Sequence, residues 1–242
     1  MGAAWAAELH DRGVSVVAVD RTPFTSGVEE IRPLAADLGT TEGVDAVLDA
    51  VRDLDVGLFI SNAAVSFEGP FVEQGLDRAL AQLDINCRAP LVLAYHLLPR
   101  FLERGRGGMI FLSSMSAWRG APLVAAYAAT KAWNLILAES LWEETRHDGV
   151  DVMAVLPGST RTPGLLGSLP QSSLGTANLM DPSDVVREAL DTLGTAPSMT
   201  PGQANRDSEA FMQSMDRTAA VTLMGEVMRQ MYPPQRSRDP AI

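Results

Sequence analysis

Short apolar runs alternate along the chain with longer stretches of helical periodicity. The runs at 14–19, 56–60, 109–112 and 150–156 are continuous, which is typical of strands covered on both faces. The stretches between and after them predict helices over 3–12, 41–53, 76–103 with a break, 126–147 and 182–193. Strands that alternate with helices predict βαβ units and hence an α/β fold with a parallel sheet.

The remainder of the chain predicts a loop, a helix and a tail. Residues 164–180 have neither helical nor strand periodicity and predict a long loop. Residues 208–231 predict one helix with a methionine-rich stripe. We interpret the stripe as packing on the core or on a partner chain rather than on a membrane surface. Residues 232–242 predict a loose tail. We therefore expect one domain, formed by 1–202 with 203–242 as a helical extension.

The composition of the chain disfavours several classes of partner. The 242 residues include 46% hydrophobic and 20% charged positions, which is typical of a globular chain. The net charge of -11 disfavours nucleic acid and anionic lipid as partners, and no apolar run approaches the roughly 18 residues of a membrane span. Cys87 is the single cysteine, and it shows no metal-ligand spacing with the three histidines. We expect a cytoplasmic protein without a metal site.

The only lysine, Lys131, follows Tyr127 by four residues on the same predicted helix face. Because the chain otherwise uses arginine, a solitary lysine indicates a site that needs a compact ammonium. A free phenol has a pKa of about 10, and a nearby ammonium favours the phenolate. We therefore expect Lys131 to lower the pKa of Tyr127 and to make it an acid/base group.

Ser114 follows the predicted strand 109–112, at the carboxyl edge of the sheet where ligands bind. Its hydroxyl is positioned to hold a substrate carbonyl. Taken alone, the pair Ser113-Ser114 is also compatible with an ordinary strand-to-loop turn.

Together with Asn86, these residues resemble the Asn-Ser-Tyr-Lys tetrad of the short-chain dehydrogenase/reductase family, at intervals of 28, 13 and 4 residues. The resemblance implies that Tyr127 is the general acid/base, that Lys131 tunes it and holds the nicotinamide ribose, and that Ser114 orients the substrate oxygen. It also implies that Asn86 keeps a proton-relay water. Hydride would move between a nicotinamide cofactor and an alcohol or carbonyl carbon. The resemblance also implies a Rossmann-like, doubly wound parallel sheet, with 1–202 as the dinucleotide-binding part of the domain.

Further segments resemble the family's cofactor-binding motifs. The Asn62-Ala63-Ala64 segment resembles its Asn-Ala-Gly turn, with Ala64 in place of the glycine, and Asp37-Leu38 resembles the pair that holds adenine. The segment after the strand 150–156 resembles the one that contacts the nicotinamide amide and phosphates. By that resemblance its cofactor contacts are Pro157, Gly158, Thr160 and Thr162.

Cofactor preference depends on the residue that ends the strand 14–19. Asp20 can accept both ribose hydroxyls of NAD and repels the additional phosphate of NADP. The neighbouring Arg21 favours NADP, because a guanidinium pairs with a 2′-phosphate. We favour NAD, and NADP remains the alternative.

The beginning of the chain resembles only the end of the family's glycine-rich turn, with Gly2 as its last glycine. The interval of 18 residues from Gly2 to Asp20 supports that alignment. By this comparison the family's first strand and two of its glycines are absent. That strand pairs with a neighbour on each side, so its loss would leave two strands of the sheet without a hydrogen-bonded partner. We therefore expect the natural active polypeptide to begin upstream of Met1.

Two function classes remain open. One is an oxidoreductase on a small alcohol or carbonyl substrate; the other is a non-catalytic scaffold that has lost nucleotide affinity. A serine hydrolase is disfavoured, because no Gly-x-Ser-x-Gly elbow occurs. An apolar substrate is suggested by Leu165, Leu166, Leu169, Leu174, Met115 and Trp118. The resemblance also implies a homo-oligomer formed through the helices that carry Asn86 and Tyr127.

Overall fold

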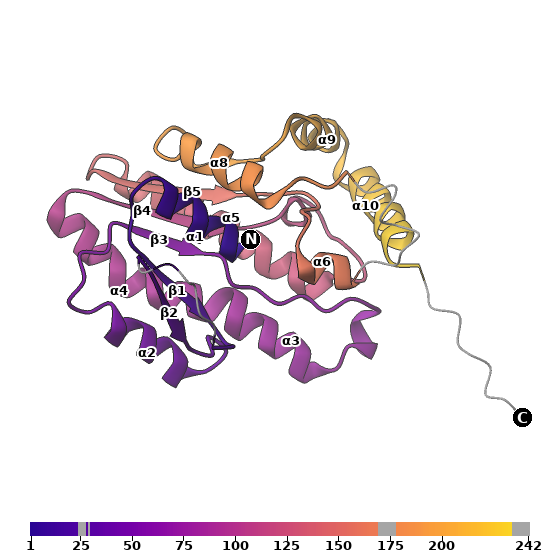
Figure 1. The fold of residues 1–242 in the computed structure, drawn as a ribbon. Coiled ribbons are helices and arrows are strands. Elements are labelled where there is room, and N and C mark those ends of the chain that lie inside the picture. The colour runs from indigo at the N-terminus through magenta and orange to yellow at the C-terminus, as the bar shows by residue number, and fades with distance from the viewer. Residues whose placement is uncertain (24–27, 29, 169–177, 234–242) are drawn as a thin grey trace, which may run out of the picture.

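The computed structural model describes residues 1–23, 28, 30–168 and 178–233. Its strands form two parallel sheets, with β1 next to β2 in one and the order β3-β4-β5-β6 in the other (Figure 1). The strands are β1 (Val16–Asp20), β2 (Ile31–Ala35), β3 (Leu58–Ser61), β4 (Gly107–Leu112), β5 (Val150–Val155) and β6 (Ser198–Met199). The predicted parallel α/β architecture is confirmed.

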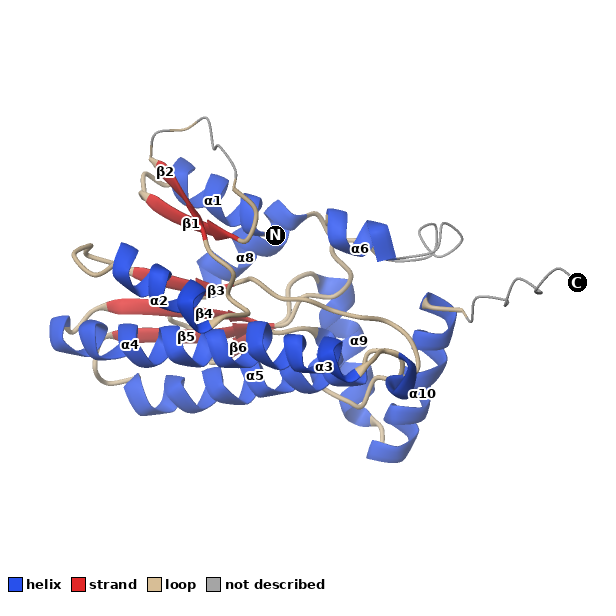
Figure 2. Cartoon of the chain, turned by 90° about the horizontal axis from the view of Figure 1, so that it is seen from below, coloured by secondary structure: helices blue, strands red, loops and turns tan. Residues whose placement is uncertain are grey.

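Helices cover both faces of the four-stranded sheet (Figure 2). Along β4, Met109 and Phe111 belong to the core cluster shared with α4 and α5, whereas Ile110 and Leu112 belong to the cluster shared with α1 and α8. This alternation is the period of two that a strand imposes. The bounds of these helices are α1 (Gly2–Asp11), α4 (Ala89–Arg104), α5 (Ala125–Thr145) and α8 (Pro182–Thr192).

The β1–β2 pair lies beyond the β3 edge of the larger sheet (Figure 2). Among the described residues no ladder joins β1 to β3, so the sheet is divided at that point. The pair is covered by α2 (Thr41–Ala50), whose Val44 and Val47 pack against Ala89 and Leu93 of α4.

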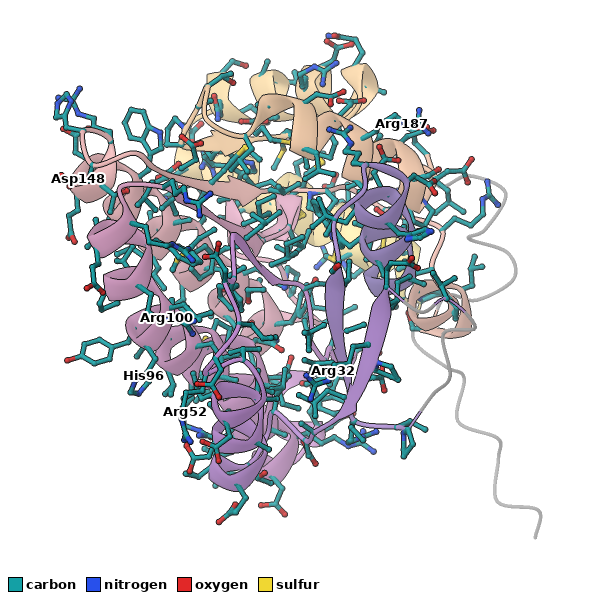
Figure 3. All side chains as sticks on the ribbon, turned by 60° about the vertical axis from the view of Figure 1, so that its left-hand side comes forward. Arg32, Arg52, His96, Arg100, Asp148 and Arg187 are labelled. Carbon is teal, nitrogen blue, oxygen red and sulfur yellow. The ribbon has the colours of Figure 1, made fainter. Side chains whose placement is uncertain are left out.

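The long helical stretch after β3 is broken as predicted. It consists of a short turn, η1 (Phe71–Glu73), then α3 (Leu76–Leu83), a π-helical turn, η2 (Asp84–Arg88), and α4. Arg100 of α4 donates to the carbonyl oxygens of Val51 and Leu54 and so fixes the segment between α2 and β3 (Figure 3). Such π-helical turns often mark functional positions.

The C-terminal region differs from the prediction. In place of one helix over 208–231, the chain forms α9 (Gln203–Ser214) and α10 (Arg217–Met231). Asp216 separates them, because its carboxylate accepts from the Ala219 N–H and caps α10 at 3.0 Å. The predicted loop begins with a short helix, α6 (Pro163–Ser168), and the rest of it from 169 to 177 lies outside the described residues.

No helix in the described ranges has the length and hydropathy of a membrane span. The tail predicted from 232 lies outside these ranges beyond residue 233.

Candidate active site

Two serines leave the carboxyl end of β4 in different directions. The Ser113 hydroxyl is buried and donates to the Lys131 carbonyl at 2.7 Å, which ties the strand end to α5. The Ser114 Oγ accepts from the Ser116 N–H at 3.2 Å and from the Ser116 hydroxyl at 3.0 Å, capping the turn η3 (Met115–Ala117). Ser114 is therefore held at the carboxyl edge of the sheet, as predicted from the sequence.

Tyr127 and Lys131 share one face of α5 near this edge. The Lys131 ammonium lies 5.5 Å from the centre of the Tyr127 ring and donates to the Leu112 carbonyl at 2.6 Å. The lysine is only 4% exposed. An ammonium is costly to bury, so its position depends on these contacts with the last residue of β4 and the phenol ring.

The electrostatics of the pair differ from the prediction. Burial raises the pKa of Tyr127 to about 12, and the hydrogen bond with Ser114 opposes this increase. Burial also lowers the pKa of Lys131 to about 8. The predicted lowering of the phenol pKa by Lys131 is wrong for this structure, because desolvation of the buried phenol has the largest effect and raises its pKa.

Asn86 connects three segments from inside η2. Its amide donates to the Val65 carbonyl at 2.9 Å and to the Thr130 hydroxyl at 3.0 Å, and its side-chain oxygen accepts from the Val65 N–H. Thr130 in turn donates to the Tyr127 carbonyl. Because both amide hydrogens of Asn86 bind protein groups, the contacts describe a positioning residue, and the water-holding role stays a prediction.

The start of α5 is fixed by a strained residue. Leu123 has φ +67°, in the left-handed region that costs a residue with a Cβ about 1–3 kcal/mol. Its carbonyl accepts from the Gly69 N–H at 2.8 Å and from the Gln74 amide at 3.2 Å. Gln74 is buried and also donates to the Gly69 carbonyl. These bonds hold Leu123 just before α5 begins, four residues before Tyr127.

The methionine-rich stripe packs on α5. Tyr127 belongs to a cluster that includes Met224, Met228 and Met231 of α10, together with Tyr232. The interpretation of the stripe as core packing is therefore confirmed for these residues. Glu68 and Tyr232 also act electrostatically on Tyr127, both in the direction that raises its pKa. Neither residue carried a signal in the sequence.

Several predicted cofactor residues meet near the start of α1. Gly2 begins α1, and a Cβ at this position would lie 3.2 Å from the Asn62 side-chain nitrogen, so the helix end and the segment after β3 are in contact. The Asn62 side-chain oxygen is buried without a hydrogen-bond partner among the described residues. Ala63 and Ala64 follow it and are exposed. The amide groups at a helix N-terminus attract phosphate.

A second group of predicted cofactor residues surrounds the end of β1. Asp20 is exposed and accepts from the Thr22 N–H at 2.8 Å. Arg21 and Asp37 line one pocket of about 330 Å³, while Leu38 packs on the cluster that contains Ala36. The Asp37 backbone is fixed by close packing, because a Cβ on Gly43 would lie 2.0 Å from its carbonyl oxygen.

The segment after β5 approaches the Ser114 turn. The Pro157 carbonyl accepts from the Met115 N–H at 3.1 Å. Gly158 lies where a Cβ would be 2.5 Å from the Asn205 side chain, so a larger residue does not fit there. Thr160 donates to the Gly158 carbonyl, and Thr162 accepts from the Leu165 N–H at the start of α6. Leu169 and Leu174 lie outside the described residues.

The sequence did not predict a supporting role for several buried polar residues near the site. Ser113, Gln74, Thr130 and Asn134 are buried. Asn134 donates to the Asn86 carbonyl at 2.8 Å. A buried polar residue inside a predicted helix is the one signal that indicates such a role, and it does not identify the partner.

Comparisons with known proteins agree with this geometry. The family model described as short chain dehydrogenase matches residues 1–170. A 7beta-hydroxysteroid dehydrogenase from Clostridium sardiniense is 30% identical over 241 residues, covering 96% of this chain and 92% of that protein.

Two solved structures extend the agreement to the fold. One, from a study of 7beta-hydroxysteroid dehydrogenase stereoselectivity, has a TM-score of 0.75 at 28% identity and covers 83% of this chain and 78% of its own. The other, a short-chain dehydrogenase from Sphingobium yanoikuyae in complex with NADPH, has a TM-score of 0.72 at 26% identity. The match covers 89% of this chain and 92% of that chain. The chain belongs to the short-chain dehydrogenase/reductase family of oxidoreductases.

Proposed function

We propose that the chain transfers hydride between a nicotinamide dinucleotide and a secondary alcohol or carbonyl carbon, using Ser114, Tyr127 and Lys131. The observation that carries this proposal is the position of the only lysine, 5.5 Å from the Tyr127 ring at the strand end that also presents Ser114. This arrangement supplies a proton donor, a cation and an orienting hydroxyl together.

Each residue has a distinct role in the proposed mechanism. Ser114 binds the substrate oxygen by a hydrogen bond. Tyr127 gives its phenolic proton to that oxygen during reduction and takes it back during oxidation. Lys131 holds the nicotinamide ribose and stabilises the phenolate, and Asn86 positions Tyr127 through Thr130. The nicotinamide supplies or accepts the hydride when it is bound.

The residues that would hold the dinucleotide fit its chemistry. The start of α1 at Gly2 offers amide groups to the diphosphate, and the adjacent Asn62 oxygen is a buried acceptor in need of a donor. The pocket beside Arg21 and Asp37 suits the adenosine end. Ala63, Ala64 and Leu38 would contact the bases and riboses, and Pro157, Gly158, Thr160 and Thr162 would contact the nicotinamide amide and phosphates.

We propose NAD as the preferred cofactor, because Asp20 is exposed at the end of β1 and free to accept ribose hydroxyls with one oxygen. In the Asp20→Ala variant the ratio of kcat/KM for NAD to that for NADP should fall by at least tenfold, since the repulsion of a 2′-phosphate is lost while Arg21 remains. Steady-state kinetics with both cofactors measure this ratio. The Asp53→Ala variant, at an exposed acid outside the site, should leave the ratio unchanged. An unaltered ratio for Asp20→Ala would contradict the assignment.

We propose a bulky apolar substrate of the steroid class. Three methionines of α10 pack beside Tyr127, and a thioether side chain adapts to an apolar ring system. The 7beta-hydroxysteroid dehydrogenase among the relatives supports a hydroxyl or keto group on such a system.

A substrate panel tests the proposed function. Hydroxysteroids, ketosteroids, small secondary alcohols and small ketones are each assayed with NAD(H) and NADP(H), following absorbance at 340 nm for the reduced cofactor. We expect the largest kcat/KM with a steroid. Turnover of small substrates alone would contradict the substrate class, and no turnover together with no dinucleotide binding would contradict the function.

The non-catalytic scaffold stays a second candidate because of one observation, the division of the sheet between β1 and β3. A scaffold would bind no dinucleotide in a calorimetric titration, whereas the enzyme would.

A homo-oligomer is the proposed assembly. Exposed apolar side chains gather on α3, α4 and α5, namely Leu80, Leu83, Leu91, Tyr95 and Ile136. Burial of such a surface is a common driving force for self-association. The cytoplasmic location stays a prediction, in line with the single buried thiol of Cys87.

A further inference from the structure

Asn205 lies in the first turn of α9, within the residues 203–242 that the sequence predicts only as a helical extension. It is 6% exposed, whereas the neighbouring Ala204 and Arg206 are exposed. A buried amide is costly unless its polar atoms have partners. The contacts of this side chain connect the C-terminal region to the segment 157–162, which follows β5.

The amide nitrogen of Asn205 has two acceptors. It donates to the Pro201 carbonyl at 2.8 Å and to the Met180 sulfur at 3.2 Å. The Met180 backbone is itself bonded to the segment 157–162. Its N–H donates to the Ser159 carbonyl at 3.0 Å, and its carbonyl accepts from the Arg161 N–H at 2.9 Å. Asn205 is therefore connected through Met180 to this segment.

The same amide group packs directly against Gly158. A Cβ on Gly158 would lie 2.5 Å from the Asn205 Oδ1 and 2.9 Å from its Nδ2. Real Cβ atoms do not approach other atoms so closely, so the Asn205 side chain fills the space that any larger residue at 158 would need. This contact is independent of the hydrogen bond to Met180, and both lead to the same segment.

The position of Gly158 connects this packing to the active site. The carbonyl of the preceding residue, Pro157, accepts from the Met115 N–H at 3.1 Å, in the turn that Ser114 caps. The backbone thus passes at Gly158 from the Ser114 turn to the threonines proposed to contact the nicotinamide half of the dinucleotide. Asn205 holds the chain at this junction.

We propose that Asn205 is a positioning residue for the nicotinamide half of the dinucleotide site, acting through Gly158 and Met180 on the backbone of 157–162. This inference rests on the proposed function. Without the amide, the packing beside Gly158 and the hydrogen bond to Met180 are lost, so the segment has to be ordered when the ligand binds. Ordering a loop on binding costs affinity, whereas a segment that is already fixed does not incur this cost. The adenosine half, assigned to the pocket at the end of β1, is unaffected.

Calorimetric titration of the full chain tests the proposal with NAD and NADP, and with ADP-ribose and its 2′-phosphate, which lack the nicotinamide. The dinucleotide that binds the wild type more tightly is compared with its own fragment. Asn205→Ala should lose about tenfold in affinity for the dinucleotide and less than about twofold for the fragment. The matched control is Arg206→Gln, because Arg206 anchors the same helix turn through an ion pair with Glu188 at 3.0 Å. It should change neither affinity by more than about twofold.

A double-mutant cycle tests the contact itself. The methyl group of Gly158→Ala meets the Asn205 amide, so this variant should also lose about tenfold in affinity for the dinucleotide and keep its affinity for the fragment. In Gly158→Ala/Asn205→Ala the methyl group has room. The affinity of the double variant should therefore be no lower than that of Asn205→Ala alone, a non-additivity expected only for residues in contact.

The outcomes separate this proposal from the proposed function. A wild type that binds neither dinucleotide would overturn both. If the wild type binds, the positioning role alone is overturned by an unchanged affinity in Asn205→Ala, by equal losses for dinucleotide and fragment, by the same loss in Arg206→Gln, or by additive losses in the double variant. Urea denaturation checks that each variant is folded. Should Asn205→Ala fail to fold, Gly158→Ala makes the same comparison of dinucleotide with fragment, and equal losses there overturn the role.

Discussion

The Tyr127→Phe variant should lose about a hundred- to ten-thousand-fold in kcat, the range that general acid–base catalysis contributes. Phenylalanine keeps the ring that packs with Met228 and receives the Lys131 ammonium, so only the proton-carrying hydroxyl is removed. The dissociation constant of the dinucleotide should change by less than about tenfold, since one hydrogen bond contributes about 1 kcal/mol. Stopped-flow or steady-state kinetics and calorimetry measure the two quantities.

Tyr95 provides the matched control, because it is 74% exposed on α4 and contacts His96 rather than the site. Tyr95→Phe should leave kcat unchanged. If Tyr127→Phe retained more than half of the wild-type kcat, the phenol would not be the acid/base group and the proposed mechanism would be wrong.

The direction of the pKa shift gives this residue a pH signature. With a pKa of about 12, the phenol stays protonated at every ordinary assay pH, so reduction always has its proton donor. Oxidation needs the phenolate. At pH values below the pKa, the phenolate fraction increases about tenfold for each unit by which the pH is raised. The oxidative kcat of the wild type should therefore rise with pH, and this dependence should be absent in Tyr127→Phe.

The predicted strands and helices were largely recovered because their patterns are long and apolar. The strand β2 was missed, since Arg32 and Pro33 interrupt its five residues; proline is tolerated there because β2 is an edge strand. Only two residues form β6, too few for a pattern. The break between α9 and α10 follows from one side chain, the Asp216 cap, which competes with helix continuation.

The candidate site was predictable only where the type and spacing of residues indicate a specific chemical role. Lys131 and Tyr127 stand out because a chain rich in arginine has a single lysine four residues after a tyrosine. The pKa of Tyr127 was not predictable, because it depends on burial by α10, and no local pattern shows that a helix beginning at Arg217 packs on this side chain. Gln74 and Leu123 likewise meet only in three dimensions.

The Lys131→Met variant should lose at least about a hundredfold in kcat and about tenfold or more in affinity for the dinucleotide. A hydrogen bond to a charged group contributes about 1.5–3 kcal/mol, and methionine keeps the length of the side chain without the ammonium. The loss of dinucleotide affinity distinguishes this variant from Tyr127→Phe. Calorimetry with the dinucleotide and steady-state assays on the substrate identified by the panel measure both effects.

Lys131 also predicts a stability signature that is independent of activity. Its pKa is lowered to about 8 in the folded chain, against 10.5 for an ordinary lysine, so between these values the unfolded chain binds more protons and stability rises with pH. From pH 7.5 to 9.5 this contribution amounts to about 2 kcal/mol. Urea denaturation at both pH values should give an increase in the wild type that exceeds the increase in Lys131→Met by that amount. Equal pH dependence in the two proteins would mean that the ammonium is hydrated in solution, which would remove the buried cation on which the proposed role of Tyr127 depends.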